Sequence, residues 1–205
     1  MPNWVYNSVA IYGDKDKVEE LYALISKPRP DIESEWVDGK PVFKEVMRQQ
    51  PLSFWNIFAP NDVVAYHNTP IESKDYHALP NGNWYDWNRE HWGCKWDASF
   101  DDPEADGVTG NALDLHFQTP WDAPRPIIEW FANYAVSNGL SLDWHYEEEQ
   151  GWGAEILVSS TGEITSKQWD IPTSHAEYEA IDRECPCEWG DETYPDCPKA
   201  EVVAP

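Results

Sequence analysis

The strongest constraint on the fold comes from two stretches in which apolar and polar residues alternate, 113–118 and 140–147. Every second side chain is apolar in each stretch, which is typical of a strand with one buried and one exposed face. Between them, apolar residues recur at helical spacing from Ile127 to Val136, and Gly139 is a typical helix end. This pattern predicts an α+β domain in which helices cover one face of an antiparallel sheet.

The N-terminal part of the chain adds a second strand and helix. Residues 3–13 are rich in β-branched and aromatic residues and end at a glycine, which predicts a strand. Asp14 fits a helix N-cap, and apolar residues at helical spacing follow over 18–25. We expect residues 31–50 to form a loop with a short helix, and residues 52–58 to form another strand.

The order of these elements predicts a ferredoxin-like, split βαβ fold with two helices on one face of the sheet. Residues 152–158 and 163–169 should add a C-terminal hairpin to the sheet. We expect this domain to cover residues 1–170, with a tryptophan-rich insertion at 61–110. Residues 171–205 should form an acidic, cysteine-containing tail with one short helix.

Net charge restricts the partners of the chain. Its 38 acidic and 14 basic residues give a formal net charge of −24, which repels nucleic-acid phosphates and anionic lipids and attracts basic protein surfaces. Acidity also favours solubility or suits a salt-adapted host. The sequence has no apolar run of about 20 residues that would span a membrane, and its start lacks the pattern of a signal peptide. We therefore expect a cytoplasmic protein that does not bind nucleic acid directly.

The segment Trp84–Asp97 holds four of the 13 tryptophans. A helix over 85–92 would place Trp84, Trp87 and His91 on one side. The segment is then either a helical plug that closes one end of the core, or the wall of a pocket for a flat or cationic ligand. We assign no catalytic residue, because no nucleophile with a neighbouring base is visible. The candidate ligand-binding residues are Trp84, Asp86, Trp87, His91, Trp92, Lys95, Trp96 and Asp97.

Several short motifs along the chain form a recognisable set. They are Pro2-Asn3-Trp4 with Asn7, Val9, Ile11 and Gly13; Phe54, Ile57 and Pro60; Trp84-Tyr85, Trp87, Trp92-Gly93 and Lys95-Trp96-Asp97; Phe117, Thr119, Trp121, Pro124 and Pro126; and Glu148, Gly151 and Gly153. With these motifs the chain resembles phage and conjugative-plasmid proteins with a YubB ferredoxin-like domain, over about residues 2–165. The resemblance implies a ferredoxin-like fold and an origin in a mobile element, and it implies no activity.

The four cysteines allow three interpretations. Cys94, Cys185, Cys187 and Cys197 would form an all-thiolate zinc site if the tail folded back onto the tryptophan segment, with His175 as an alternative ligand. The Cys-x-Cys spacing is not the common two-residue spacing of zinc sites. Free thiols and a disulfide are the other two interpretations, and no cofactor is assigned.

Two further groups of polar residues are candidates for a site. His116 and His145 occupy polar positions of the two alternating stretches, with Asp114 and Asp143 beside them. On neighbouring strands they could bind a metal or shuttle protons, or they could simply form a solvated face. The acidic candidates for binding a partner are Asp101, Asp102, Glu104, Asp106, Glu147, Glu148 and Glu149.

These observations support three hypotheses of function. The first is an accessory protein of a phage or mobile element that acts like a DNA mimic. It would occupy the basic, nucleic-acid-binding surface of a host protein such as a defence enzyme. The second is a small-molecule or nucleotide binder, or an enzyme, that uses the Trp84–Asp97 pocket. The third, binding of single-stranded nucleic acid on the sheet, ranks last, because the polar strand positions carry acids instead of lysine or arginine.

Overall fold

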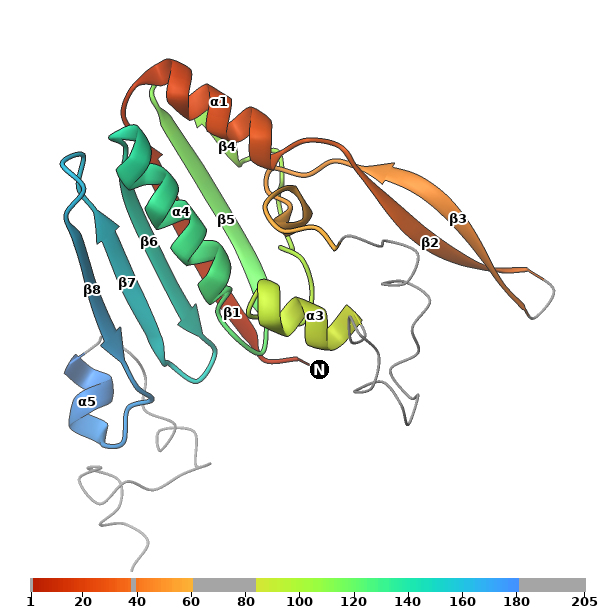
Figure 1. Cartoon of the computed structure of the whole chain (residues 1–205). Coiled ribbons are helices and arrows are strands. Elements are labelled where there is room, and N and C mark those ends of the chain that lie inside the picture. The colour runs from red at the N-terminus through yellow and green to blue at the C-terminus, as the bar shows by residue number, and fades with distance from the viewer. Residues whose placement is uncertain (1, 38–39, 61–83, 181–205) are drawn as a thin grey trace, which may run out of the picture.

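The computed structural model describes residues 2–37, 40–60 and 84–180 and shows an α+β fold (Figure 1). The sequence-predicted insertion therefore lies partly outside the described residues, as does most of the predicted tail. Along the described chain the elements are β1 (Trp4–Tyr12), α1 (Lys15–Ile25), β2 (Arg29–Val37), β3 (Lys40–Arg48), a 3-10 helix (Phe54–Asn56), α3 (Trp84–His91), β4 (Gly107–Thr109), β5 (Ala112–Pro120), α4 (Arg125–Asn138), β6 (Ser141–Glu148), β7 (Gly153–Val158), β8 (Ile164–Trp169) and α5 (His175–Ala180).

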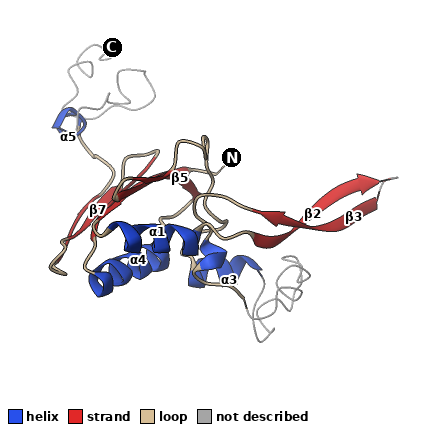
Figure 2. Cartoon of the chain, turned by 90° about the horizontal axis from the view of Figure 1, so that it is seen from above, coloured by secondary structure: helices blue, strands red, loops and turns tan. Residues whose placement is uncertain are grey.

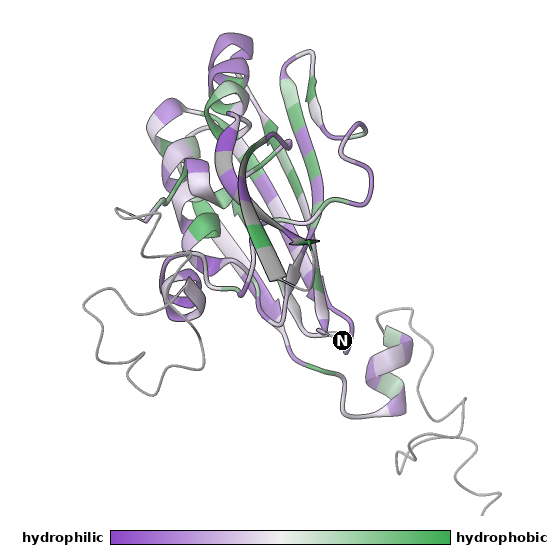
Figure 3. Cartoon of the chain, turned by 90° about the vertical axis from the view of Figure 1, so that its right-hand side faces the viewer, coloured by the Kyte–Doolittle hydropathy of each residue, from purple (hydrophilic) through white to green (hydrophobic). Residues whose placement is uncertain are grey.

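Six of the strands form one antiparallel sheet in the order β4-β5-β1-β6-β7-β8. Helices α1 and α4 lie on the same side of this sheet (Figure 2). The alternation of hydrophilic and hydrophobic residues along the strands is visible in Figure 3. The apolar positions point toward the helices and are buried, which confirms the prediction of an α+β fold with helices on one face.

The two helices connect strands in an interlocked way. Helix α1 lies in the connection from β1 to β4, and β5 pairs between these two strands. Helix α4 connects β5 to β6, and β1 pairs between them. Each helix therefore links two parallel strands that are separated by a third, antiparallel strand.

Local signals in the sequence explain where the helices begin and end. The carboxylate of Asp14 accepts hydrogen bonds from the backbone N–H groups of Asp16 and Lys17, which caps α1. Helix α4 starts beside two prolines and ends at Gly139. The φ of Gly139 is 65°, a left-handed conformation that glycine adopts without a steric penalty, so the chain can turn back into β6.

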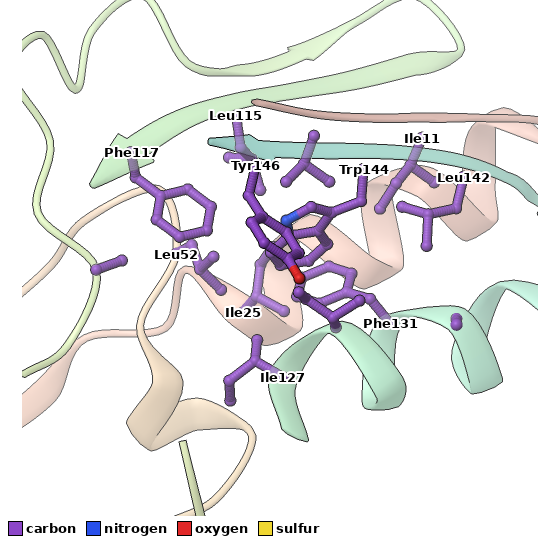
Figure 4. Close-up of a cluster of buried hydrophobic side chains, with 14 of the residues drawn as sticks. Ile11, Ile25, Leu52, Leu115, Phe117, Ile127, Phe131, Leu142, Trp144 and Tyr146 are labelled. Carbon is purple, nitrogen blue, oxygen red and sulfur yellow. The ribbon is translucent and has the colours of Figure 1, made fainter. Parts of the chain in front are cut away.

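The core fills the space between the sheet and the two helices (Figure 4). Trp144 of β6 lies at its centre, with ring-centroid distances of 5.9 Å to Phe117 and 5.3 Å to Phe131. The indole N–H donates to Oδ1 of Asn7, 3.2 Å away, so the polar group of this buried side chain is satisfied. The core is thus packed by aromatic edges as well as by aliphatic side chains.

The prediction for residues 31–50 is wrong. They lie mostly in β2 and β3, which form an antiparallel hairpin that projects from the body as an arm (Figure 1). Val37, Val42 and Met47 of this arm are exposed. Two pairs of adjacent apolar residues, Val42-Phe43 and Val46-Met47, break the alternation in β3 that would identify a half-buried strand.

The strand predicted at residues 52–58 is also wrong. Residues 54–56 form a 3-10 helix, because Asn56 N and Ile57 N donate to the carbonyls of Ser53 and Phe54 and not to a neighbouring strand. Residues 107–109, which lie inside the predicted insertion at 61–110, form β4 and pair with β5. In the described part of the chain, no helix has the length and apolar character required to cross a membrane.

Candidate functional site

The tryptophan segment contains a short helix, α3, over Trp84–His91, which ends near Gly93. Gly93 has a φ of 84°, and a Cβ there would lie 2.9 Å from the backbone nitrogen of Arg125, so α3 packs closely against the start of α4. Trp92 is buried against Trp55, with a centroid distance of 5.9 Å, and its indole N–H donates to the carbonyl of Phe58. Trp92 therefore closes one end of the core.

Asp97 fixes the chain that follows α3. Its carboxylate accepts hydrogen bonds from Ser53 Oγ at 2.6 Å, Phe54 N at 2.7 Å and Ala98 N at 2.9 Å. Its Oδ2 also lies 3.2 Å from Nη2 of Arg29. Burial raises the pKa of Asp97, and the Arg29 charge opposes that rise. The base of the arm, the 3-10 helix and the tryptophan segment all meet at this carboxylate.

A cavity of about 710 Å3 lies beside Asp97, between α3 and the base of the arm. Two arginines that sequence reasoning missed, Arg29 and Arg48, line it together with Asp31. They are directly opposite each other in the register of the hairpin. Without a predicted hairpin, nothing in the sequence brings these arginines to the tryptophan segment.

The cavity divides the candidate ligand-binding residues into two groups. Four of them line it: Trp84, Trp92, Trp96 and Asp97. The other four lie outside its lining: Asp86, Trp87, His91 and Lys95. Trp87 stacks on His91 with a centroid distance of 4.2 Å, and the Nζ of Lys95 lies 4.5 Å above the ring of Trp96. The segment therefore contributes both to closing the core and to lining the cavity, and Trp92 takes part in both.

The sheet face opposite the helices carries the second group of polar candidates. Ser8 of β1 is paired with His116 of β5 on one side and His145 of β6 on the other. In the next row, Ala10 is flanked in the same way by Asp114 and Asp143. We call this surface the open face. Its residues are Tyr6, Ser8, Ala10, Tyr12, Asp114, His116, Gln118, Asp143, His145, Glu147, Glu155, Leu157, Thr165, Lys167 and Trp169, together with the loop 101–106.

The loop before β4 lies over this face and forms one wall of a groove of about 520 Å3. Asp106 holds the loop, since its Oδ1 accepts from His116 N at 2.7 Å and lies 3.0 Å from His116 Nδ1. Asp101 Oδ2 accepts from Gln118 Nε2 at 2.6 Å. The groove is therefore fixed by contacts between side chains of the loop and of β5.

The predicted cluster of histidines and aspartates is brought to one face, but strand β1 separates its two halves. Among residues 2–37, 40–60 and 84–180, no three His, Cys, Asp or Glu side chains are placed to hold a metal ion. The two aspartates do act electrostatically on Tyr12. Burial is the largest cause of the raised pKa of Tyr12, and Asp143 and Asp114 raise it further.

The acidic candidates differ in exposure. Asp101, Asp102, Glu104 and Glu149 are exposed, and Glu147 is half-buried on the open face. Asp106 and Glu148 are buried, so these two carboxylates cannot contribute to an exposed acidic surface. Glu148 accepts a hydrogen bond from Gln150 N at 2.6 Å and stabilises the turn between β6 and β7.

No known protein family, curated protein or solved structure matches the chain.

Cys94 of the tryptophan segment is part of the core. Its thiol is buried and donates to the carbonyl of Trp96, with an S···O distance of 3.2 Å. Burial raises the pKa of Cys94 well above its ordinary value, and Asp97 and Asp122 raise it further. The other three proposed zinc ligands, Cys185, Cys187 and Cys197, lie outside the described residues.

We expect Cys94 to resist alkylation in the folded protein. A buried thiol with a raised pKa carries almost no thiolate at pH 8, and the thiolate is the reactive form. Iodoacetamide should modify Cys94 at least about a hundredfold more slowly in buffer than in denaturant. Mass spectrometry of the tryptic peptide 90–95 measures this residue separately from the other cysteines. Equal rates in the two conditions would show that the thiol is accessible.

Proposed function

We propose that this chain is a binding protein of a phage or conjugative plasmid, and that its open face docks on a basic protein surface. The observation that carries the proposal is the distribution of charge on that face. Three exposed acids lie in the loop and four carboxylates lie on the strands, whereas Lys167 is the one lysine or arginine at the described strand positions of the face. The seven acids are Asp101, Asp102, Glu104, Asp114, Asp143, Glu147 and Glu155.

Exposed aromatic side chains also support the proposal that the open face binds a partner. Tyr6 and Tyr12 of β1 are exposed, although tyrosine rings bury large areas when a partner covers them. Leu157 of β7 is exposed on the same face. A face that combines carboxylates with tyrosines fits a partner rich in arginine and lysine, because these residues pair with carboxylates and stack on aromatic rings.

The open face carries fewer negative charges per unit length than duplex DNA does. Strand β1 has 9 residues and is therefore about 30 Å long. Duplex DNA carries about 18 phosphate charges over that length, compared with seven carboxylates on the open face. We therefore infer competition for a basic groove that otherwise holds nucleic acid, with part of the binding energy supplied by aromatic contacts. Direct binding of single-stranded nucleic acid is disfavoured by the same charges.

We further propose that the fold is ferredoxin-like and that the chain is related to the YubB-domain proteins of phages and plasmids. The support for the fold is the order β4-β5-β1-β6 with α1 and α4 as the two connecting helices, which is the order of two interlocked split βαβ units. The support for the family is the resemblance of the short motifs, which include the start of β1 and the segment Trp84–Asp97.

The proposal predicts that neutralising the open face weakens binding to a basic probe. The probe is a 20-residue lysine-rich peptide, titrated into the full chain by calorimetry at low and at physiological salt. We expect the triple variant Asp114→Asn, Asp143→Asn, Glu147→Gln to bind about tenfold more weakly, since each exposed ion pair contributes up to about 1 kcal/mol. Binding should also weaken as salt increases.

A matched triple variant separates this surface from net charge alone. Glu20, Glu90 and Glu129 are exposed. They belong to α1, α3 and α4, and these helices lie on the side of the sheet opposite the open face (Figure 2). Replacing all three by glutamine changes the net charge by the same amount and should leave binding within about twofold of the wild type. If the two triple variants weakened binding equally, or if the peptide did not bind at low salt, the open face would not be the docking surface.

A further inference from the structure

A buried arginine without enough acceptors lies at the base of the 710 Å3 cavity. The side chain of Arg29 is about nine-tenths buried. Its Nη2 lies 3.2 Å from Asp97 and its Nη1 lies 3.4 Å from Asp31. Its Nε and Nη1 nevertheless have no hydrogen-bond acceptor among the described residues. Buried guanidinium N–H groups without acceptors are unfavourable, and the residue that carries them, Arg29, is part of the cavity lining.

The two carboxylates in the cavity wall are already occupied by other donors. Asp97 accepts three hydrogen bonds in addition to its contact with Arg29. Asp31 Oδ2 is paired with the Nε of Arg48, whose side chain is 48% exposed and also lines the cavity. The base of the cavity thus presents guanidinium donors to an incoming group. A carboxylate or phosphate has the matching acceptors, and arginine binds such planar or multidentate acceptors well.

The walls of the cavity are suited to a flat ring. Five indoles and a phenyl ring surround the two arginines, and the volume lies within the range of small-molecule sites. The described lining residues contain two arginines and two aspartates as their charged groups, so their formal charges cancel. In a chain with a net charge of −24, such a cavity is a place where an anion meets little repulsion. The aromatic wall consists of Trp4, Trp55, Trp84, Trp92, Trp96 and Phe100.

We propose that this cavity binds a small planar anion, an aromatic ring that carries a phosphate or a carboxylate. The anionic group approaches the Arg29 guanidinium, and the ring lies among the indoles between α3 and the base of the arm. Pro103 of the loop 101–106 lines this site, but no other described residue of the open face does, and the ligand does not depend on the docking function proposed above.

Calorimetry of the full chain with four probes tests the ligand class. Adenosine 5′-monophosphate carries a ring and a phosphate, and 2-naphthoate carries a ring and a carboxylate. Adenosine and inorganic phosphate each supply one half of the first probe. We expect at least one of the two ring anions to bind about tenfold or more tightly than adenosine or phosphate alone, because ring and anion are recognised together. Tighter binding of the nucleotide identifies phosphate as the preferred group, and tighter binding of naphthoate identifies carboxylate.

Two variants and a control locate the binding. Arg29→Lys keeps the charge but loses the planar donor group, and should lower the affinity for the ring anion by about tenfold. Trp84→Ala removes a half-buried wall residue and should also weaken binding by about tenfold, while Arg29 and Asp97 stay in place. Arg125→Lys makes the matched change at an exposed position on α4, outside the cavity, and should leave affinity within about twofold.

Thermal unfolding of each variant shows whether it remains folded, and Trp84→Ala decides the question if Arg29→Lys does not fold. Loss of affinity in either folded variant, with Arg125→Lys unchanged, supports the proposal. It would be overturned if neither ring anion bound the wild type at millimolar concentration. It would also be overturned if the folded cavity variants bound as tightly as the control.

Discussion

Replacement of Asp97 by alanine is expected to lower the free energy of unfolding by about 3–5 kcal/mol, because removing one partner of a buried ion pair leaves an uncompensated charge. In this chain the charge left behind is Arg29, whose Nη2 is 3.2 Å from the Asp97 carboxylate. The substitution also deprives the Ser53 hydroxyl and the backbone N–H groups of Phe54 and Ala98 of their acceptor. Denaturation by urea, followed by circular dichroism, measures the loss.

An exposed aspartate provides the control for this prediction. Asp102 lies in the loop over the open face and is exposed. Asp102→Ala should change the free energy of unfolding by no more than about 0.5 kcal/mol, as is usual for surface positions. A loss below about 1 kcal/mol for Asp97→Ala would mean that water reaches Arg29 and replaces the carboxylate. The contacts around Asp97 would then not be what holds the arm to the body.

Asp97 also illustrates why one part of the fold was predictable and another was not. Strands β1, β5 and β6 are half-buried, so their sequences alternate and identify them. Residues 52–58 are mostly apolar, and a short apolar stretch does not by itself distinguish a strand from other buried structure. Here the backbone N–H of Phe54 bonds to a side chain 43 residues later in the sequence, and no local pattern encodes that partner.

The candidate site, like the fold, is only partly predictable from local sequence patterns. The tryptophan segment is recognisable because indoles are concentrated in a short stretch, and its helix and its end at Gly93 follow from local rules. The cationic half of the cavity comes from Arg29 and Arg48, which belong to an arm whose second strand, β3, does not alternate in sequence. Likewise, the sequence places His116 and His145 on polar positions, but only the sheet register shows that β1 lies between them.

Replacement of Trp144 by alanine should be comparably destabilising, with a loss of about 3–5 kcal/mol, the usual range for a buried tryptophan or phenylalanine. The side chain is fully buried, and its edges contact Phe117 of β5 and Phe131 of α4. Alanine would leave a cavity between the sheet and α4 that the surrounding strands cannot close without losing their register. It would also remove the donor to Asn7 Oδ1 in β1.

A second substitution of Trp144 separates packing from hydrogen bonding, and a substitution of an exposed tryptophan provides the control. Trp144→Phe keeps an aromatic ring in the core but loses the hydrogen bond to Asn7, so we expect a smaller loss, about 1–3 kcal/mol. Trp121 is about half exposed, and Trp121→Ala should cost no more than about 1 kcal/mol. If Trp144→Phe were as damaging as Trp144→Ala, the hydrogen bond to Asn7 would dominate. If both cost less than about 1 kcal/mol, the sheet and α4 would be held together elsewhere. That outcome would contradict the central role of the indole, because Trp144 is the side chain that contacts β1, β5 and α4 at once.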